Sequence, residues 1–235
     1  MKLIAWNCHQ SFRTKADKIL AMNPDVLVLP ECEIPSKLSS KGIDFRDAHW
    51  VGKNKNKGLA ILTFNNWTLE VLDEAKPPIP FIIPLRLQRE GESFVLWAVW
   101  SQKPDTHNNY GVRMWKALSS YSQLLSQEKI IITGDFNSSS KWDRKGRRSN
   151  HSNTVKVLNE HGIKSMYHEH FSEQQGQESR ATLFFTYNED KPFHIDYCFA
   201  SEWFGQRLRS MTVGAVNDWL EDSDHMPLIV DFEGV

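Results

Sequence analysis

Short polar clusters beside apolar runs contain the side chains that this sequence could use for chemistry. They are Asn7 after "LIAW", Glu31 after "DVLVLP", Asp135 and Asn137 after "IIITG", Asp196 within "HIDYCFA", and Asp224 with His225 before "MPLIVDF". An Asn or Asp at a strand end is usually a turn former. Asp196 is harder to explain in this way, because a carboxylate inside an apolar strand is costly unless it has a partner such as a histidine.

Together these are the residue types that metal-assisted hydrolysis of a phosphate ester requires. Mg²⁺ takes oxygen ligands, usually one or two carboxylates with water and phosphate oxygens, and it stabilises charge on the phosphoryl oxygens and the leaving group. A further carboxylate orients or deprotonates the attacking water, while asparagine amides bind oxygens without adding negative charge. A His–Asp pair keeps an imidazole oriented and basic, so that the protonated ring donates to the phosphate. The inventory therefore predicts a phosphoric-ester hydrolase.

Short β-type runs and a few helical patterns must position these side chains. Apolar periodicity predicts helices over residues 14–23, 110–125 and 152–161. The runs with strand character, several of them apolar on both faces, are residues 2–6, 25–30, 59–64, 81–87, 94–100, 129–134, 182–187, 194–200, 211–216 and 228–232. Because no repeat or linker interrupts this pattern, we expect a single domain over residues 1–235 in the α/β or α+β class, with helices outside packed sheets.

Composition limits the kinds of protein that the sequence fits. The chain has 235 residues, of which 40% are hydrophobic and 24% charged, as is ordinary for a globular protein. A formal net charge of −1 argues against a protein that coats nucleic acid through bulk charge. Apolar runs are far shorter than the roughly 20 residues that span a bilayer, and "MKLIAWNCHQ" lacks the apolar stretch of a secretion signal. With three dispersed cysteines, we expect a cytoplasmic protein without membrane association or an obligate protein partner.

The sequence resembles the endonuclease/exonuclease/phosphatase superfamily, which includes DNase I and the apurinic endonucleases. The resemblance rests on "WN" (6–7), "PE" (30–31), "GDFN" (134–137), "HIDY" (194–197) and "SDHMPL" (223–228), which follow the family's order. It implies a four-layer α/β/β/α sandwich of two packed, mainly antiparallel sheets flanked by helices, with the site at one rim. It also implies Mg²⁺ as cofactor, with Mn²⁺ as a substitute. Glu31 is implied as the principal metal ligand and Asp224 as a further metal-site carboxylate.

The same resemblance implies roles for the remaining site residues. Asp135 would position or deprotonate the attacking water. Asn137 and Asn7 would hold phosphate oxygens or that water. His225 would stabilise the phosphate, with its ring oriented by Asp196.

Two positions depart from the family's pattern. Trp100 ends the run "FVLWAVW", where many relatives have a catalytic His or a phosphate-contacting Tyr, and His9 stands where some relatives have Asp or Asn. Tyr110, at the start of the next predicted helix, is a candidate for the missing phosphate donor, although it also fits that helix's apolar stripe. Arg180 and Thr182 in "ESRATLFF" are further candidate phosphate contacts.

The basic segment after "GDFN" favours nucleic acid as the substrate. Residues 141–148, "KWDRKGRR", contain five cations and one anion. A charge run is usually a solvated loop, but beside the site these cations would bind flanking phosphates, and an exposed tryptophan would stack on a base. The candidate contacts in this segment are Trp142, Arg144, Lys145, Arg147 and Arg148.

We therefore expect a Mg²⁺-dependent phosphodiesterase, an endonuclease or exonuclease that hydrolyses DNA or RNA by metal-assisted attack of water. One alternative is a phosphatase or phosphodiesterase for a nucleotide, an inositol phosphate or another small molecule. Another is an inactive member that binds nucleic acid or a protein. Two other sites fit poorly: the adjacent residues of "SDH" cannot form a Ser-His-Asp relay, and His168 and His170 lack a third zinc ligand at a recognised spacing.

Overall fold

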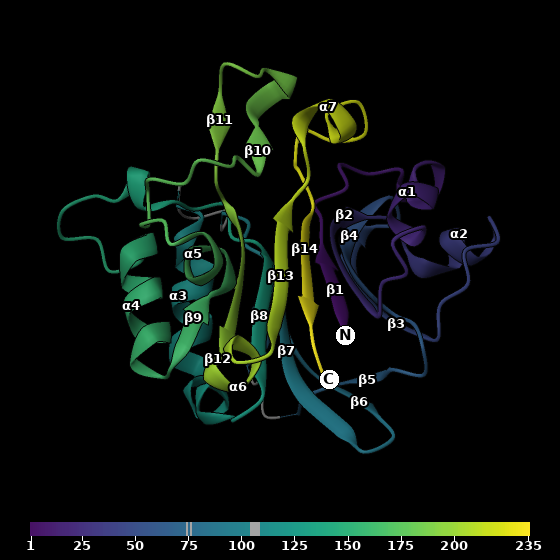
Figure 1. Ribbon diagram of the computed structural model, residues 1–235, viewed down its shortest axis with the longest axis horizontal. Coiled ribbons are helices and arrows are strands. Elements are labelled where there is room, and N and C mark those ends of the chain that lie inside the picture. Colours follow the sequence, from purple (N-terminus) through teal and green to yellow (C-terminus); the bar gives the residue numbers. More distant parts are fainter. Residues whose placement is uncertain (74, 76, 104–108) are drawn as a thin grey trace.

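Two six-stranded sheets pack face to face in the computed structural model, which describes residues 1–73, 75, 77–103 and 109–235 (Figure 1). The first sheet has the order β13 (Leu208–Val213), β14 (Leu228–Phe232), β1 (Lys2–Ala5), β2 (Val26–Cys32), β4 (Lys57–Thr63) and β3 (Asp47–Asn54). The second has the order β5 (Thr68–Val71), β6 (Ile82–Arg89), β7 (Glu92–Trp100), β8 (Ile130–Asp135), β12 (Asp196–Ser201) and β9 (Ile163–Ser165). A short hairpin of β10 (Leu183–Phe184) and β11 (Pro192–Phe193) projects beyond the sheets.

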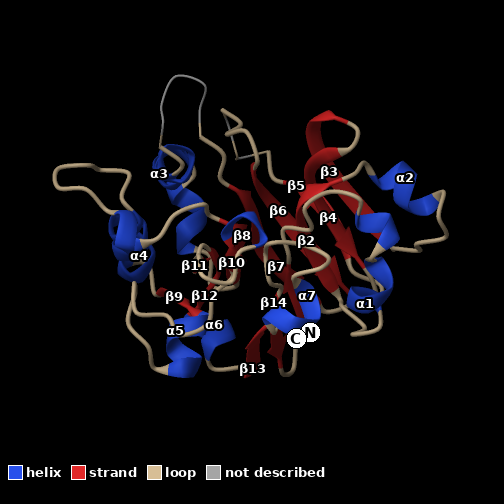
Figure 2. Ribbon diagram, turned by 90° about the horizontal axis from the view of Figure 1, so that it is seen from above, coloured by secondary structure: helices blue, strands red, loops and turns tan. Residues whose placement is uncertain are grey.

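Helices cover the outer face of each sheet, so the expected four-layer α/β/β/α sandwich is confirmed (Figure 2). Those outside the first sheet are α1 (Ala16–Leu20) and α2 (Pro35–Ser39), and those outside the second are α3 (Gly111–Ser120) and α4 (His151–Glu160). The shorter helices are α5 (Met166–Phe171), α6 (Glu202–Gly205), α7 (Val216–Trp219) and the 3₁₀ turns η1 (Phe12–Thr14), η2 (Ser122–Ser126), η3 (Ser140–Trp142) and η4 (Phe185–Tyr187).

Strands that are apolar on both faces supply two cores at once. In β1, Leu3 and Ala5 belong to the core between the sheets, whereas Ile4 belongs to the core under the first sheet's helices. In β8, Ile131 faces the first of these cores, and the neighbouring isoleucines face α3 and α4. This alternation fixes which way each strand presents its last residues, since successive side chains point to opposite faces.

Both sheets are mainly antiparallel, as expected, and within the described ranges each contains one parallel pair, β1 with β2 and β7 with β8. The sequence did not reveal β3, β5, β9 or β11, which are short or carry partly exposed, mixed residues. The strand predicted over 182–187 is wrong beyond Phe184, because the chain turns there with Thr186 and Tyr187 at positive φ. None of the helices in the described part of the chain has the length and apolar character needed to cross a membrane.

Candidate active site

The predicted site residues meet at one rim of the two sheets. Parallel strands end at this edge of a sheet, and the strands antiparallel to them begin there. Asp135 at the end of β8 pairs in register with Trp100 at the end of β7 and with Asp196 at the start of β12. In the facing sheet, Asn7 follows β1, and His225 precedes β14, which pairs antiparallel with β1. The facing sheets thus bring these residues, far apart in the sequence, to one place.

Gly134 is required for the close approach of β7 and β8 at this rim. Its φ is +133°, and a Cβ at this position would lie 2.1 Å from the carbonyl oxygen of Val99. No side chain fits in that space, so the glycine of "GDFN" is a packing requirement as well as a turn residue.

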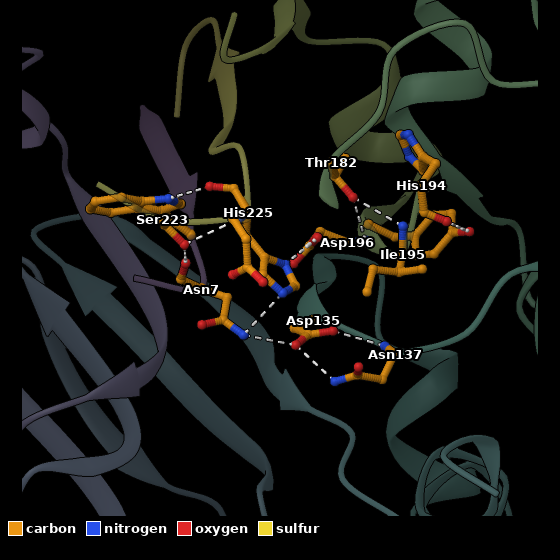
Figure 3. A network of polar contacts seen from close by, with 12 residues as sticks. Asn7, Asp135, Asn137, Thr182, His194, Ile195, Asp196, Ser223 and His225 are labelled. Carbon is orange, nitrogen blue, oxygen red and sulfur yellow. Dashed lines mark hydrogen bonds and ion pairs between the residues drawn. The ribbon is translucent and has the colours of Figure 1, made fainter. Parts of the chain in front are cut away.

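Asp135 lies in a buried hydrogen-bonded network, shown in Figure 3. Its Oδ2 accepts a hydrogen bond from Asn7 Nδ2 at 3.0 Å and one from Asn137 Nδ2 at 2.8 Å. Burial, and next the charge of Asp196, raise the pKa of Asp135 to about 7, against the opposing effects of His225 and the two asparagines. A carboxyl group with that pKa can exchange a proton near neutral pH.

Asn137 reaches Asp135 through a turn. Strand β8 ends at Asp135, and Asn137 has a φ of +48° and donates its backbone N–H to Asp135 Oδ1 at 2.8 Å. Strand alternation is therefore not the reason that the two side chains meet. The backbone and side-chain N–H groups of Asn137 both donate to Asp135, so in this structure Asn137 orients the carboxylate.

His225 is held through Nδ1, while its Nε2 only lies beside the amide nitrogen of Asn7. Nδ1 lies 2.9 Å from Asp196 Oδ2, and Nε2 lies 3.4 Å from Asn7 Nδ2. Burial by itself lowers the pKa of His225, but the charge of Asp196 and its hydrogen bond, together with Asp135 and Asp224, outweigh this effect and raise the pKa to about 10. The imidazole is therefore cationic at neutral pH, with Nε2 toward the side where Asp135 lies.

The backbone around this histidine is fixed by "WN" and "SDH" themselves. The indole N–H of Trp6 donates to the carbonyl oxygen of His225 at 2.8 Å. Ser223 Oγ donates to the carbonyl of Asn7 at 2.7 Å and accepts from the backbone N–H of His225 at 3.0 Å. Ser223 is a positioning residue, which agrees with the expectation that "SDH" is not a relay.

Thr182 is fully buried and offers no surface to the substrate phosphate that it was expected to contact. Its Oγ1 instead accepts hydrogen bonds from the backbone N–H groups of Ile195 and Asp196, each at 3.0 Å. Arg180 is also used elsewhere: its guanidinium pairs with Glu173 at 3.1 Å and lies 3.9 Å from the ring centre of Phe171. Thr182 therefore supports the start of β12, whereas the side chain of Arg180 is engaged with Glu173 and Phe171.

Glu31 stands in a β-bulge of β2, with a φ of +62° that non-glycine residues rarely adopt. Its Oε2 lies 2.9 Å from Lys57 Nζ, which makes an ion pair. The geometry of this contact is not that of a hydrogen bond, so the buried Oε2 has none. Asp224 is similar, because its buried Oδ1 lies 3.2 Å from Nδ1 of His9 without hydrogen-bond alignment.

Tyr187 lies close to both carboxylates. Burial, and then the charges of Asp224 and Glu31, raise the pKa of its phenol, and its ring is 5.5 Å from that of His9. His9, which stands where some relatives have Asp or Asn, thus lies beside Asp224 at the rim.

These two carboxylates fit a divalent cation, since each has a buried oxygen that lacks a hydrogen bond and oxygen is the ligand that Mg²⁺ prefers. Among the described residues, ligand atoms of Asp135, Asp196 and His225 also lie within 4.8 Å of one another. Those atoms are already hydrogen-bonded, to each other or to asparagines. A cation there would break existing hydrogen bonds, whereas at Glu31 and Asp224 it would replace only the ion-pair contacts with Lys57 and His9.

The remaining substrate candidates separate into two groups. A pocket of about 100 Å³ beside Asn137 is lined by Tyr110, Trp142 and Arg147, and the first two side chains are exposed. Tyr110 directly precedes α3, so its assignment to that helix's apolar stripe is wrong. Arg144, Lys145 and Arg148 lie on the same loop but do not line this pocket.

Lys57, which pairs with Glu31, is a residue of this rim that the sequence pattern did not identify. It lies at the start of β4, next to a turn of lysines and asparagines with no apolar pattern. No local signal distinguishes it from its solvated neighbours; only the pairing of β2 with β4 brings it to Glu31.

Solved structures with this fold share little sequence with the chain. A 3′ phosphatase, NExo, from Neisseria, bound to a product DNA hairpin, is 16% identical with a TM-score of 0.70 over 99% of each chain. The APE2 catalytic domain of Xenopus laevis is 14% identical with a TM-score of 0.71, covering 99% of this chain and 92% of that one. An AP endonuclease from Archaeoglobus fulgidus is 15% identical, with a TM-score of 0.70 over 99% of each chain.

Sequence comparison identifies the family more directly than these fold neighbours. No curated protein matches the chain in sequence. A model of the endonuclease/exonuclease/phosphatase family, however, matches residues 4–225, which include "WN", "PE", "GDFN" and "HIDY" together with Asp224 and His225. The resemblance drawn from these motifs is thereby confirmed. The chain belongs to the endonuclease/exonuclease/phosphatase family.

Proposed function

We propose that this protein is a Mg²⁺-dependent phosphodiesterase that hydrolyses DNA or RNA. Membership of the family indicates a hydrolytic nuclease or phosphatase. The observation that carries the finer proposal is the presence, at one rim, of a buried acid/base network and two carboxylates that each have a buried oxygen without a hydrogen bond.

Glu31 and Asp224 would hold the cation, with Mn²⁺ as a substitute for Mg²⁺. When bound, it supplies charge neutralisation at the phosphoryl oxygens and the leaving group. Lys57 now neutralises Glu31 and would have to turn away from Oε2 on metal binding.

Asp135 is proposed to take a proton from the attacking water. Its pKa of about 7 matches that role, and the amides of Asn7 and Asn137 fix the direction of its carboxylate. Each asparagine would use its remaining amide capacity for the water or a phosphate oxygen.

His225, oriented by Asp196, is proposed to donate from Nε2 to a non-bridging phosphate oxygen. The ring is cationic because of Asp196, so this donor would be a charged one directed at developing negative charge.

Nucleic acid is favoured over a small phosphate ester by the pocket beside Asn137. Tyr110 offers a hydroxyl, Arg147 a cation and Trp142 an exposed indole on which a base could stack. One structural neighbour is described as a phosphatase bound to DNA, which makes removal of a terminal phosphate from nucleic acid the second candidate.

The test is a cleavage assay with end-labelled single- and double-stranded DNA and RNA in Mg²⁺ or Mn²⁺. We expect shortened products that disappear with EDTA and in the Asp135→Asn variant. Fragment lengths distinguish endonucleolytic from exonucleolytic cleavage. Release of inorganic phosphate alone from 3′- or 5′-phosphorylated strands, or turnover of nucleotides or inositol phosphates without strand cleavage, would overturn the phosphodiesterase assignment.

A further inference from the structure

A second pocket, of about 350 Å³, opens beside the ion pair of Glu31 and Lys57. It is separate from the pocket beside Asn137, and the start of α3 lies between the two: Tyr110 and Gly111 line the first, and Arg113 lines the second. Its floor includes Trp100, which pairs in register with Asp135. Adjacent strands are about 4.8 Å apart, so this pocket adjoins the proposed catalytic centre.

The charged side chains among the described residues that line this pocket are all cationic. No aspartate or glutamate is among the described residues that line it, whereas four cationic side chains are: Lys53, Lys57, Lys103 and Arg113. Lys57 is paired with Glu31, so the excess positive charge of the described lining comes mainly from the exposed Lys53 and Lys103, and like charges beside a concave surface attract an anion. The ligand that the charges favour is therefore an anion.

Aromatic side chains give the pocket an apolar wall as well. Trp100 and Phe81 pack edge to face with ring centres 5.0 Å apart. Lys57 Nζ lies 5.8 Å from the centre of the Trp100 ring, and the guanidinium of Arg113 lies 5.6 Å from that of Phe81. Cations beside aromatic surfaces suit a phosphate that is attached to a sugar or base.

The β3–β4 hairpin that supplies two of these lysines is braced against the strand that bears Glu31. The indole of Trp50 lies over Gly52 and Gly58, where a Cβ would come within 2.3 Å and 2.4 Å of its ring atoms. The indole N–H also donates to the carbonyl oxygen of Cys32 at 3.1 Å. Lys53 and Lys57 are thus presented by a hairpin fixed to the metal-site strand.

We propose that this pocket, defined by Lys53, Lys57, Phe81, Trp100, Lys103 and Arg113, is a second phosphate-binding subsite. It takes a phosphate of the substrate strand other than the one that is cleaved, either an internal flanking phosphate or a terminal one. The inference rests on the proposed function, because it assigns a place to a neighbouring part of the same substrate. Lys57 belongs to both the pocket and the ion pair with Glu31. Without a metal ion it neutralises Glu31, and when a metal ion takes its place beside Glu31 its ammonium group becomes available to the phosphate in the pocket.

The test uses Lys53→Glu combined with Lys103→Glu, two exposed positions at which charge reversal leaves the core intact. The matched control reverses Lys156 and Lys164, which are exposed and paired with glutamates away from the pocket. We expect the pocket variant to bind a fluorescent single-stranded oligonucleotide at least about 10-fold more weakly than wild type in EDTA. The slope of log Kd against log salt should also fall by about 0.7 for each phosphate that the variant no longer neutralises.

Equal Kd values and salt slopes for the pocket variant and the control would overturn the subsite. Comparison of oligonucleotides with and without a 5′- or 3′-phosphate identifies the occupant: weaker binding of phosphorylated strands alone indicates a terminal phosphate, and equally weaker binding of both kinds indicates an internal one. Thermal unfolding of the variants separates an effect on binding from an effect on folding.

Titration with inorganic pyrophosphate in a calorimeter keeps this inference separate from the proposed function. If wild type cleaves no nucleic acid, the proposed function fails, yet pyrophosphate binding that is abolished only in the pocket variant still supports an anion subsite. If wild type cleaves nucleic acid and the pocket variant binds oligonucleotide and pyrophosphate as the control does, only the subsite fails.

Discussion

The Nδ1 atom of His225 lies 2.9 Å from Oδ2 of Asp196, and both side chains are buried. The contact joins the segment that precedes β14 of the first sheet to the first residue of β12 in the second. Asp196 fixes the ring and keeps it protonated, since its charge more than offsets the effect of burial on the pKa of His225. A buried histidine with a bound carboxylate is thus ready to donate from its other nitrogen.

Removal of the negative charge of Asp196 should impair turnover more than folding. We expect Asp196→Asn to lower kcat by about 10²- to 10⁴-fold, because the ring loses both its orientation and its charge. The amide retains the shape of the side chain, so the far-ultraviolet circular dichroism spectrum should be unchanged. The exposed Asp218→Asn is the matched control, and a kcat within twofold of wild type for Asp196→Asn would contradict the proposed role of the pair.

The affinity for a divalent cation should respond in opposite directions to changes at Glu31 and Lys57. Glu31→Gln removes a ligand charge and should weaken binding of Mn²⁺ by at least about 10-fold, as measured by calorimetry. Lys57→Met removes the cation that competes for Oε2 and should strengthen binding severalfold.

Glu92→Gln, which breaks a partly exposed ion pair with Lys129, is the control for both changes. The assignment of Glu31 as a metal ligand is wrong if Glu31→Gln and this control bind the ion equally well.

Gly134→Ala should be among the most damaging small substitutions in the chain. The added methyl would lie 2.1 Å from the carbonyl oxygen of Val99, and the alanine backbone would have to adopt a φ of +133°. We expect a decrease of about 3 kcal/mol in the free energy of unfolding, from overpacking together with backbone strain. Gly162 has a φ of +69° but open space around its Cα. Gly162→Ala should therefore lower the free energy of unfolding by only about 1 kcal/mol. Urea unfolding of the two variants compares them, and equal decreases would show that the contact with Val99 is not limiting.

Acid should destabilise the fold through the buried imidazole of His151. Burial lowers its pKa from 6.5 to about 4, against the smaller opposing effects of Asp143, Gln175 and Glu178, while His194 adds to the lowering. As the pH falls below 6.5 the unfolded chain takes up this proton before the folded protein does, so the stability contributed by the neutral ring is lost progressively down to about pH 4.

Replacement of that ring should flatten the pH dependence of stability. We expect wild type to lose about 2 kcal/mol more than His151→Gln between about pH 7 and pH 5. Unfolding in urea at each pH measures the difference, and the exposed His161→Gln should behave as wild type. Parallel pH profiles for wild type and His151→Gln would exclude His151 as the source.

The sequence by itself determined most of the fold and the composition of the site. Runs such as "KIIITG", apolar on both faces, indicated strands between layers, and the family resemblance of the motifs at their ends implied a site at one rim. Asp196 stood out because a carboxylate in an apolar strand needs a partner, and the structure supplies His225. These features are local in sequence, so pattern and spacing were enough to find them.

Only the tertiary structure decided which of these side chains lie in the site and which support its backbone. Thr182 and Arg180 resembled phosphate contacts in sequence, yet one holds the backbone of Asp196 and the other pairs with Glu173. Lys57 has no distinguishing neighbours, but strand pairing places it against Glu31. Such contacts depend on which strands pair and in what register, and no local residue pattern records that choice.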